Sequence, residues 1–486
     1  MTIVHRVLPL EPVADLADHL RRRGAAGWEA ARAVEPEVLI AEVLASGLRG
    51  RGGGGFPTGV KWRTVRDNRS TVESSSVVVN GAEGEPGTFK DRTIMRLNPF
   101  AVVEGALIAA RAVGADQVIF GLKASFGPEL VRVRQAIEEV QRAGWAEGVD
   151  LTVFEGPDEY LYGEETAMLE TIDGRHPLPR VAPPYRQGVS EVDSDSGLPA
   201  GVGMAGPGTG TSAPPTLVNN VETLANVPDI IARGAAWFRQ EGTEDSPGTI
   251  VCTVTGSTKR HGVGEVSMGT PLREVIDVIG GGLRSGGQVK AVLSGVANAL
   301  VPAALLDTPL TYEAMNAIGS GLGSAGFIVF DDADDLTAVV AGVSRFLAVE
   351  SCGQCTPCKQ DGLALSGLLA QLSRSEAGAD ELEQVRSRAL TVTDEARCYL
   401  ATQQQLVVAS LLDLFPEEVE RHLRAEVGAV EPALIAELVD IEGDRAVIDE
   451  GHRDKQPDWT YDETDSGKSP AARLGGPQGP EVLPDS

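Results

Sequence analysis

Residues 76–92 read SVVVNGAEGEPGTFKDR, and they introduce the pattern that decides the fold of the first part of the chain. The β-branched run Val77 to Val79 predicts a short buried strand, and a polar, glycine-containing loop follows it. Helices and strands are then predicted in alternation at 99–113 (helix), 117–122 (strand), 129–143 (helix) and 151–154 (strand). Strands that alternate with helices in this way are typical of βαβ units. We therefore expect an α/β fold with a mostly parallel sheet.

The rest of the 486-residue chain divides into further parts by its pattern of apolar, charged and turn-forming residues. A chain of this length is expected to form several domains, each with its own core. The predicted parts are an α/β domain over 1–245 that starts with a helical region at 12–48, a small α+β module over 246–334, a helical bundle over 335–440 and an acidic tail over 441–486. The tail has little to bury and is predicted to be largely disordered. A Gly-, Pro- and Ser-rich stretch at 186–215 is predicted to form a long loop inside the first domain.

Charge and composition limit the possible partners and compartments. The formal net charge of −28 argues against binding to nucleic acid, which requires clustered Lys and Arg. The sequence has no run of about 18 apolar residues, so we expect no direct membrane insertion. Its first residues also lack the apolar segment and cleavage site of a signal peptide. Five cysteines in this length do not indicate a disulfide scaffold, and a reducing cytoplasm is the expected compartment.

Four of the five cysteines have the spacing of cluster or metal ligands. Cys352, Cys355 and Cys358 lie in the run CGQCTPC, and Cys398 follows forty residues later. Four Cys are the usual ligand set of a [4Fe–4S] cluster. A tetrahedral zinc site also takes four Cys, but it more often uses two CxxC pairs. The spacing favours the cluster, with zinc as the alternative, and Cys252 is not expected to take part.

A glycine-rich loop with basic neighbours begins at Gly50. Its residues GRGGGG match G-x-G-x-x-G, but a helix rather than a strand is predicted before it, which argues against an ordinary dinucleotide fingerprint. Glycines let backbone N–H groups approach an anion, and basic side chains neutralise its charge. The nearby basic residues have no acid between them: Arg49, Arg51, Lys61, Arg63 and Arg66. We therefore predict a phosphate site; the alternative is a flexible linker, although linkers seldom contain aromatic residues such as Phe56 and Trp62.

Three further segments place polar groups where a ligand is expected. Residues 80–91 follow the first predicted strand, at the end of the sheet where ligands bind in open α/β folds. Residues 160–166, YLYGEET, put two acids in the first turn of a predicted helix, and residues 218–223, VNNVET, offer amide side chains suited to a ring or a ribityl chain. Taken alone, the acids are also explained by the helix dipole and the amides by an N-cap.

These motifs together resemble the NADH-binding 51 kDa-type flavoprotein subunit of respiratory complex I, and the diaphorase subunits of NAD-linked hydrogenases and formate dehydrogenases. The matching segments are GLRGRGGGGFPTGVKW, EGEPGTFKDR, GEETAMLETIDG, PTLVNNVETLANVP, MGTPLREVI and ESCGQCTPC. The resemblance covers about residues 40–415. It implies a Rossmann-like FMN domain, then a soluble-ligand-binding β-grasp module, then a helical bundle that binds a [4Fe–4S] cluster.

The resemblance also implies roles for individual residues. It places the glycine loop and Lys61 against phosphate groups, and it places Phe56, Glu85 and Glu165 at positions that meet NADH. It implies flavin contacts from Asn80, Tyr160, Gly163, Asn219, Asn220 and Thr223. The predicted cofactor-binding set is completed by residues of the same matching segments: Gly50, Arg51, Gly52, Gly53, Glu83, Glu164 and Val218.

The implied activity is that of an NADH dehydrogenase subunit, in which NADH reduces FMN and single electrons leave through the cluster. The implied partners are a [2Fe–2S] thioredoxin-like subunit and further iron–sulfur or catalytic subunits, which could hold the chain at the inner face of a membrane. A second hypothesis is a relay or scaffold subunit that keeps the cluster without turning over NADH. A third, a β-grasp interaction module, accounts only for residues 249–330.

The sequence departs from the family pattern at several positions near the expected site. Ala82 stands where an Asp is typical, and Tyr162 replaces a Cys. The loop between Tyr185 and Pro215 is longer than usual and could cover the nucleotide entrance. The run YLATQQQ after Cys398 replaces a segment of small residues. The second hypothesis draws its support from Ala82 and the long loop.

Overall fold

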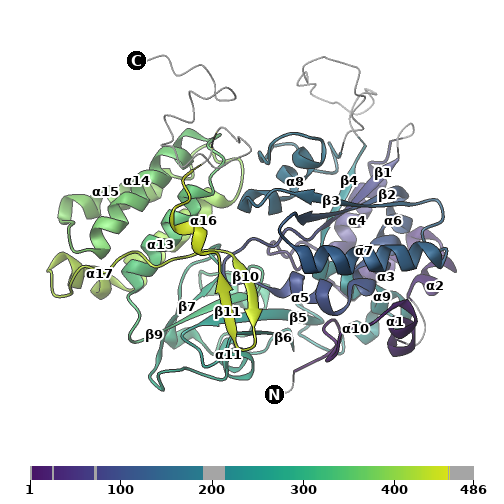
Figure 1. Ribbon diagram of the computed structural model, residues 1–486, viewed down its shortest axis with the longest axis horizontal. Coiled ribbons are helices and arrows are strands. Elements are labelled where there is room, and N and C mark those ends of the chain that lie inside the picture. Colours follow the sequence, from purple (N-terminus) through teal and green to yellow (C-terminus); the bar gives the residue numbers. More distant parts are fainter. Residues whose placement is uncertain (1–2, 24–26, 71–73, 190–213, 458, 460–486) are drawn as a thin grey trace, which may run out of the picture.

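The protein is described by a computed structural model over residues 3–23, 27–70, 74–189, 214–457 and 459 (Figure 1). Its first part is built around a four-stranded parallel sheet. The strands are β1 (Ser75–Asn80), β2 (Ala115–Lys123), β3 (Asp150–Gly156) and β4 (Thr216–Asn220), in the order β3-β2-β1-β4. In register, Val78 lies between Ile119 of β2 and Val218 of β4. The predicted α/β fold with a parallel sheet is confirmed, and β4 is a strand that the sequence pattern does not indicate.

Helices cover both faces of this sheet because its residues alternate between two hydrophobic cores. Val77 and Val79 of β1 pack into the larger core, and Val78 packs into the smaller one on the opposite face. The larger core includes α6 (Pro99–Val113), in which every residue except Arg111 is buried. The other helices of this part are α4 (Thr58–Asp67), α5 (Lys90–Leu97), α7 (Gly127–Arg142), α8 (Glu165–Ile172), α9 (Val221–Arg233), α10 (Ala235–Phe238) and the 3-10 turn η1 (Tyr160–Gly163).

The predicted helical region at 12–48 is divided into three short helices. They are α1 (Leu16–Arg23), α2 (Gly27–Arg32) and α3 (Pro36–Ser46). Gly27 starts α2 where the chain passes close to α9, since a Cβ there would lie 2.4 Å from the carbonyl oxygen of Pro228. Pro36 occupies the first turn of α3, where its missing N–H costs nothing. Gly47 ends α3 in the left-handed conformation with φ of +71°.

The second part is a five-stranded mixed sheet with the order β6-β5-β9-β7-β8. Its strands are β5 (Thr249–Gly256), β6 (Gly262–Ser267), β7 (Val289–Ser294), β8 (Val301–Pro302) and β9 (Gly326–Asp331). The parallel pairing of β5 with β9 is flanked by antiparallel neighbours. The helices of this α+β module are α11 (Leu272–Gly280) and α12 (Tyr312–Ala317), and a short 3-10 turn η2 (Ala303–Leu305) follows β8.

The third part is a bundle of charged and apolar helices, as the sequence predicts. Its helices are α13 (Leu336–Val349), α14 (Thr356–Ser373), α15 (Ala379–Thr391), α16 (Leu400–Leu414) and α17 (Pro416–Leu423). The prediction of a largely disordered tail from residue 441 is wrong for its first residues. A hairpin of β10 (Leu438–Glu442) and β11 (Arg445–Ile448), followed by η3 (Glu450–Arg453), packs against all three parts. Residues 458 and 460–486 of that tail lie outside the described residues.

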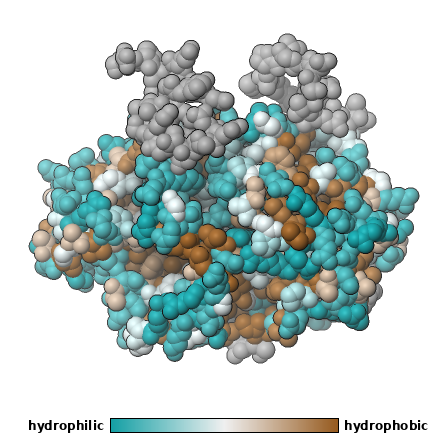
Figure 2. All heavy atoms as spheres, in the orientation of Figure 1, coloured by the Kyte–Doolittle hydropathy of each residue, from teal (hydrophilic) through white to brown (hydrophobic). Residues whose placement is uncertain are grey.

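The three parts meet at the centre of the molecule, and the C-terminal hairpin crosses the face shown in Figure 1. Figure 2 shows that the same face is largely hydrophilic, with hydrophobic residues in smaller groups. Within the described ranges, no single helix has the length and apolar character of a membrane span. One pair of helices among the described residues, α5 and α6, bent by 98°, passes such a test jointly, on length and composition alone.

Candidate functional site

A cavity of about 540 Å³ opens where the three parts of the chain meet. It lies at the carboxyl ends of β1 and β4, whose last residues, Asn80 and Asn220, are register partners and both line it. This is the edge at which open α/β sheets bind their ligands. Nine of the predicted cofactor-binding residues line the cavity: Gly52, Gly53, Asn80, Glu83, Glu85, Tyr160, Gly163, Glu164 and Asn220.

The glycine loop forms one wall of this cavity and is fixed from behind. The backbone N–H of Arg51 donates to Oγ1 of Thr223 at 2.8 Å, and Oη of Tyr312 donates to the carbonyl of Gly50 at 2.8 Å. A Cβ on Gly52 would lie 3.1 Å from the side chain of Asn220, so glycine lets the loop approach this strand end. Gly55 has φ of +59°, and a Cβ there would lie 2.5 Å from the ring of Tyr312. The loop is therefore a backbone cradle of the kind that accepts an anionic group.

The basic residues around this loop do not converge on a single anion, contrary to the sequence prediction. Arg51 is buried behind the loop, and Lys61 forms an ion pair with Glu165. Arg66 forms an ion pair with Glu37, which precedes it by 29 residues in the chain. Arg49 alone of the predicted basic set lines the cavity, where its guanidinium stacks on Tyr312 at 4.0 Å from the ring centroid. Acids distant in sequence neutralise these charges, which inspection of the local sequence does not reveal.

A buried network of charges supports the loop from below. Nζ of Lys90 lies 2.7 Å from Asp91 and 2.9 Å from Glu222, and Nε of Arg51 lies 3.9 Å from Glu222. Burial lowers the pKa of Lys90, but the carboxylates of Asp91, Glu222 and Glu83 outweigh it and hold that pKa above its usual range. The amide of Asn220 also donates to Asp91 at 2.7 Å. The network therefore couples the glycine loop to the end of β4.

Several predicted polar residues cap helices as well as line the cavity. Glu83 accepts backbone N–H groups of residues 90, 91 and 92 at the start of α5. Glu164 accepts from Thr166 and Ala167 at the start of α8, and Asn220 caps α9. Loss of solvation, followed by repulsion from Asp91, raises the pKa of Glu83 to about 7. These residues therefore cap helices and also line the cavity.

Tyr160 and Glu85 form a hydrogen-bonded pair in the wall of the cavity. Oη of Tyr160 donates to Glu85 at 2.6 Å, and Nε2 of Gln403 in α16 donates to the same hydroxyl at 2.9 Å. The other oxygen of Glu85 accepts the N–H of Val296 at 2.7 Å. Loss of solvation raises the pKa of Glu85, and the same effect, with the nearby Glu85 carboxylate, raises the pKa of Tyr160. Gln403 belongs to the unusual QQQ run, which here connects the helical bundle to the cavity.

Eight predicted cofactor residues do not line the cavity. Thr223 and Gly50 hold the glycine loop as described above, and Asn219 accepts Nε1 of Trp62 at 2.8 Å. Val218 is buried in the smaller core, and the side chain of Phe56 is 56% exposed. Arg51, Lys61 and Glu165 are engaged in the ion pairs given above. The long loop predicted at 186–215 lies mostly outside the described residues, at positions 190–213.

The second part of the chain contributes cavity residues that the sequence does not predict. They are Ala297, Asn298, Tyr312, Asn316, Leu322, Gly323 and Ser324. Two of them lie between β7 and β8, two lie in α12 and three lie just before β9, all more than 200 residues after the glycine loop and without a recognisable motif. Of the departures from the family pattern, Ala82 lines the cavity, whereas Tyr162 is fully buried beside Gly156.

The four predicted cysteine ligands lie around one pocket, next to the cavity. Cys352 and Cys355 lie between α13 and α14, Cys358 lies in the first turn of α14, and Cys398 lies just before α16. The rest of the wall is mainly apolar: Leu161, Pro179, Ser351, Ala396, Arg397, Leu400 and Ala401. Cys398 lines this pocket and the larger cavity. Cys252 is buried in β5, in the core of the second part.

The donor set fits a cluster better than a single ion. A zinc tetrahedron with bonds of about 2.3 Å would bring all four sulfurs within about 4 Å of one another. Among the described residues, no three Cys, His, Asp or Glu side chains lie close enough to hold one metal ion. A [4Fe–4S] cluster binds each thiolate through a separate iron, which suits sulfurs that are farther apart. Burial raises the pKa of Cys358 to about 11 and the pKa of Cys398 to about 12, so the iron must supply the charge that keeps these sulfurs as thiolates.

Comparison with known proteins identifies the family. The model of the Nuo51 FMN-binding domain matches residues 43–229, and that of the NADH-ubiquinone oxidoreductase-F iron-sulfur binding region matches residues 338–422. The F subunit of NADH-quinone oxidoreductase of Rickettsia typhi is 34% identical over 398 residues, which are 80% of this chain and 89% of that protein. The chain belongs to the family of NADH-quinone oxidoreductase F subunits.

Other members and solved structures agree with this family. The F 2 subunit of NADH-quinone oxidoreductase of Rhizobium meliloti is 35% identical over 401 residues, covering 80% of this chain and 89% of that protein. The crystal structure of an NAD+-reducing [NiFe]-hydrogenase in the H2-reduced state matches with a TM-score of 0.72 and 31% identity. The match covers 87% of this chain and 68% of the hydrogenase chain. The family resemblance inferred from the sequence motifs is confirmed.

Proposed function

We propose that this member of the F-subunit family oxidises NADH with bound FMN and passes the electrons singly through a [4Fe–4S] cluster to partner subunits. The observation that carries the proposal is the shared wall formed by Cys398, which lines both the cavity at the sheet edge and the four-cysteine pocket. A cofactor in the cavity and a cluster on these thiols would therefore be neighbours.

When bound, FMN would accept a hydride and the cluster would accept single electrons. The residues of the chain bind and orient these groups. The backbone of Gly52 and Gly53 offers N–H groups to a phosphate, and Asn80 and Asn220 present polar side chains at the strand ends. Tyr160, held between Glu85 and Gln403, fixes the wall nearest the helical bundle. The apolar residues around the cysteines keep water from the cluster, a condition that favours electron transfer over side reactions.

The nucleotide preference follows from the acids at the site. Glu85 lies in the cavity wall, and Glu165 lies with Lys61 just outside it. A 2′-phosphate near these carboxylates would meet like-charge repulsion, so NADH is preferred over NADPH. Phe56 is exposed and free of the core, which makes it available to stack on a nucleotide.

The test is to purify the full chain anaerobically, measure iron, sulfide, zinc and flavin, and follow flavin reduction by stopped flow. We expect FMN rather than FAD, four irons with matching sulfide, and faster bleaching by NADH than by NADPH. Cys398→Ser should lose the cluster, and Cys252→Ser should keep it. Stoichiometric zinc without labile sulfide would overturn the cluster assignment. Flavin and cluster that respond to neither nucleotide would overturn NADH oxidation and support the relay hypothesis.

The proposed partners are subunits of a larger complex, since the relatives carry the names of complex subunits. We infer that a [2Fe–2S] thioredoxin-like subunit is the immediate partner and that further iron–sulfur or catalytic subunits receive the electrons. Binding to these subunits would hold the chain at the inner face of the membrane. Co-purification from native membranes tests both points, and recovery of the chain alone in every fraction would contradict them.

A further inference from the structure

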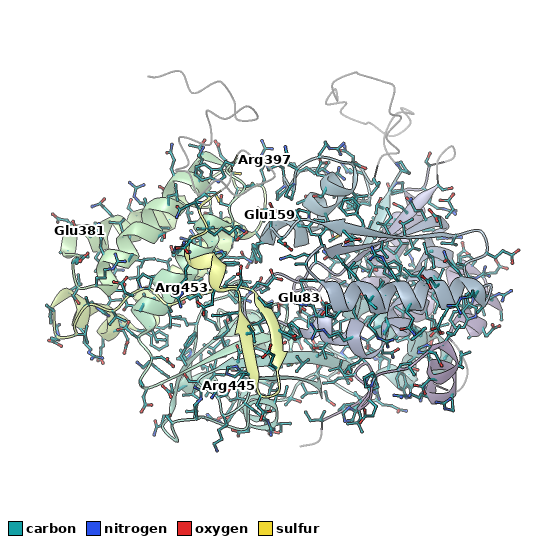
Figure 3. The ribbon with its side chains drawn as sticks, viewed as in Figure 1. Glu83, Glu159, Glu381, Arg397, Arg445 and Arg453 are labelled. Atoms are coloured by element: carbon teal, nitrogen blue, oxygen red, sulfur yellow. The ribbon has the colours of Figure 1, made fainter. Side chains whose placement is uncertain are left out.

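The described C-terminal residues 433–457 and 459, here called the C-terminal strap, lie beyond the matched iron–sulfur region, which ends at residue 422. It contacts each of the three parts of the chain. The N–H of Ala433 donates to the carbonyl of Ala338 in α13 at 2.9 Å. Glu437 forms an ion pair with Lys123 of the first sheet. Residues 444 and 446 exchange hydrogen bonds with His261 beside β6. Figure 3 shows Arg445 and Arg453 on this strap, which crosses in front of the junction between the parts.

The last described residue of the strap packs directly on the cysteine loop. Nε1 of Trp459 donates to the carbonyl of Ser351 at 2.9 Å, and the indole is 8% exposed. Gly353 has φ of +74°, and a Cβ there would lie 2.7 Å from the same indole. Nζ of Lys359, the residue that follows Cys358 in the chain, lies 4.1 Å from the centroid of the Trp459 ring. Trp459 thus touches the loop on both sides of its three cysteines.

A second group of contacts connects the strap, through Glu350, to the wall of the cavity at the edge of the first sheet. One oxygen of Glu350 accepts from Nε2 of His452 at 3.0 Å and from Nζ of Lys455 at 2.7 Å. Its other oxygen accepts the backbone N–H of Tyr160 at 3.1 Å. Arg345 of α13 donates to the carbonyls of residues 452, 453 and 455. The strap therefore reaches the residue that precedes Ser351 and, through it, the turn that carries Tyr160.

We propose that the C-terminal strap positions the [4Fe–4S] ligands. Trp459 sets the conformation of the loop 351–358. His452 and Lys455 bind Glu350, which connects the strap to the backbone of Tyr160. A loop with three ligands, and with Gly353 in the left-handed region, has few backbone restraints of its own. Groups behind metal ligands orient them, and their loss typically weakens metal binding about 10- to 100-fold. This inference rests on the proposed function, which supplies the cluster that the positioned cysteines would hold.

The test compares Trp459→Ala and Trp459→Phe with the matched control Arg453→Ala in the full chain. Arg453 lies on the same strap, but within the described residues its side chain pairs with the exposed Glu450 at the surface. We measure anaerobic loss of iron to a chelator and the EPR spectrum of the reduced protein. Trp459→Ala should lose iron at least about tenfold faster, with an altered EPR signal. Trp459→Phe keeps a ring over Lys359 and should fall between, while Arg453→Ala should match the wild type. Equal rates and spectra in all four proteins would overturn the proposal.

A second measurement separates this inference from the proposed function. If the wild type contains no iron and sulfide, the proposed function fails for the cluster. The positioning role of Trp459 then still predicts that alkylation of Cys352 and Cys355 is faster in Trp459→Phe than in Arg453→Ala. Equal alkylation rates in cluster-free protein would count against positioning. Trp459→Phe is the milder of the two substitutions of Trp459. The comparison of Trp459→Phe with Arg453→Ala therefore still tests the proposal if Trp459→Ala does not fold.

Discussion

The buried charges beneath the glycine loop predict a large effect of replacing Glu222 by alanine. Glu222 is fully buried, 2.9 Å from Nζ of Lys90 and 3.9 Å from Nε of Arg51. Its Oε1 also accepts the N–H of Val251 at 2.9 Å. The substitution removes an ion-pair partner from both Lys90 and Arg51, and it removes the side-chain acceptor of the Val251 N–H.

The magnitude follows from these distances. Two unit charges 2.9 Å apart attract by about 6 kcal/mol at an effective dielectric constant of about 20. Desolvation offsets part of this attraction, and removal of one partner from a buried pair costs about 3 to 5 kcal/mol in measured cases. We therefore expect Glu222→Ala to lower the free energy of unfolding by about 3 to 5 kcal/mol. Glu222→Gln keeps an acceptor for Val251 and should lose less.

The assay is urea unfolding of the flavin-free protein, followed by tryptophan fluorescence and far-UV circular dichroism. Glu420→Ala is the control, because Glu420 pairs with Arg424 on an exposed helix face, where such pairs contribute about 0.5 kcal/mol. If Glu222→Ala changes the unfolding free energy by no more than Glu420→Ala, the reasoning from the buried network is refuted. Equal losses for Glu222→Gln and Glu222→Ala would show that the charge, which both variants lack, accounts for the whole effect; no loss for Glu222→Gln would show that charge is not what matters there.

Two other predictions concern the cavity wall and the smaller core. The pKa of Glu83 is about 7 in the folded protein, above the ordinary carboxyl value, so the folded state holds this proton more tightly than the unfolded state. As the pH rises from about 4.5 to about 7, the unfolding free energy of the wild type should therefore fall relative to that of Glu83→Gln. A difference between the two proteins that stays the same in urea unfolding at about pH 5, 6 and 7 would contradict this. The Oη of Tyr162 has no hydrogen-bond partner within the described structure, so Tyr162→Phe should leave stability unchanged or raise it by up to about 1 kcal/mol; a clear loss in thermal unfolding would reveal a partner for that hydroxyl.

The sequence by itself determined the features that depend on residues close together in the chain. The βαβ alternation, the end of α3 at Gly47 and the helix at 99–113 follow from local periodicity and glycine geometry. The cysteine triplet predicts a cluster because ligand spacing is set by a few residues of backbone. The motif order was also enough to identify the family, since the matching segments are long and specific.

Only the tertiary structure decided which residues from distant segments share a site. It paired Lys61 with Glu165 and Arg51 with Glu222, so the charges that the sequence groups beside the glycine loop are divided among separate partners. It also brought Gln403 to Tyr160, and Trp459 to the cysteine loop. These contacts join residues that are far apart in the chain. Local periodicity does not encode them, because they depend on how the three parts of the chain pack against one another.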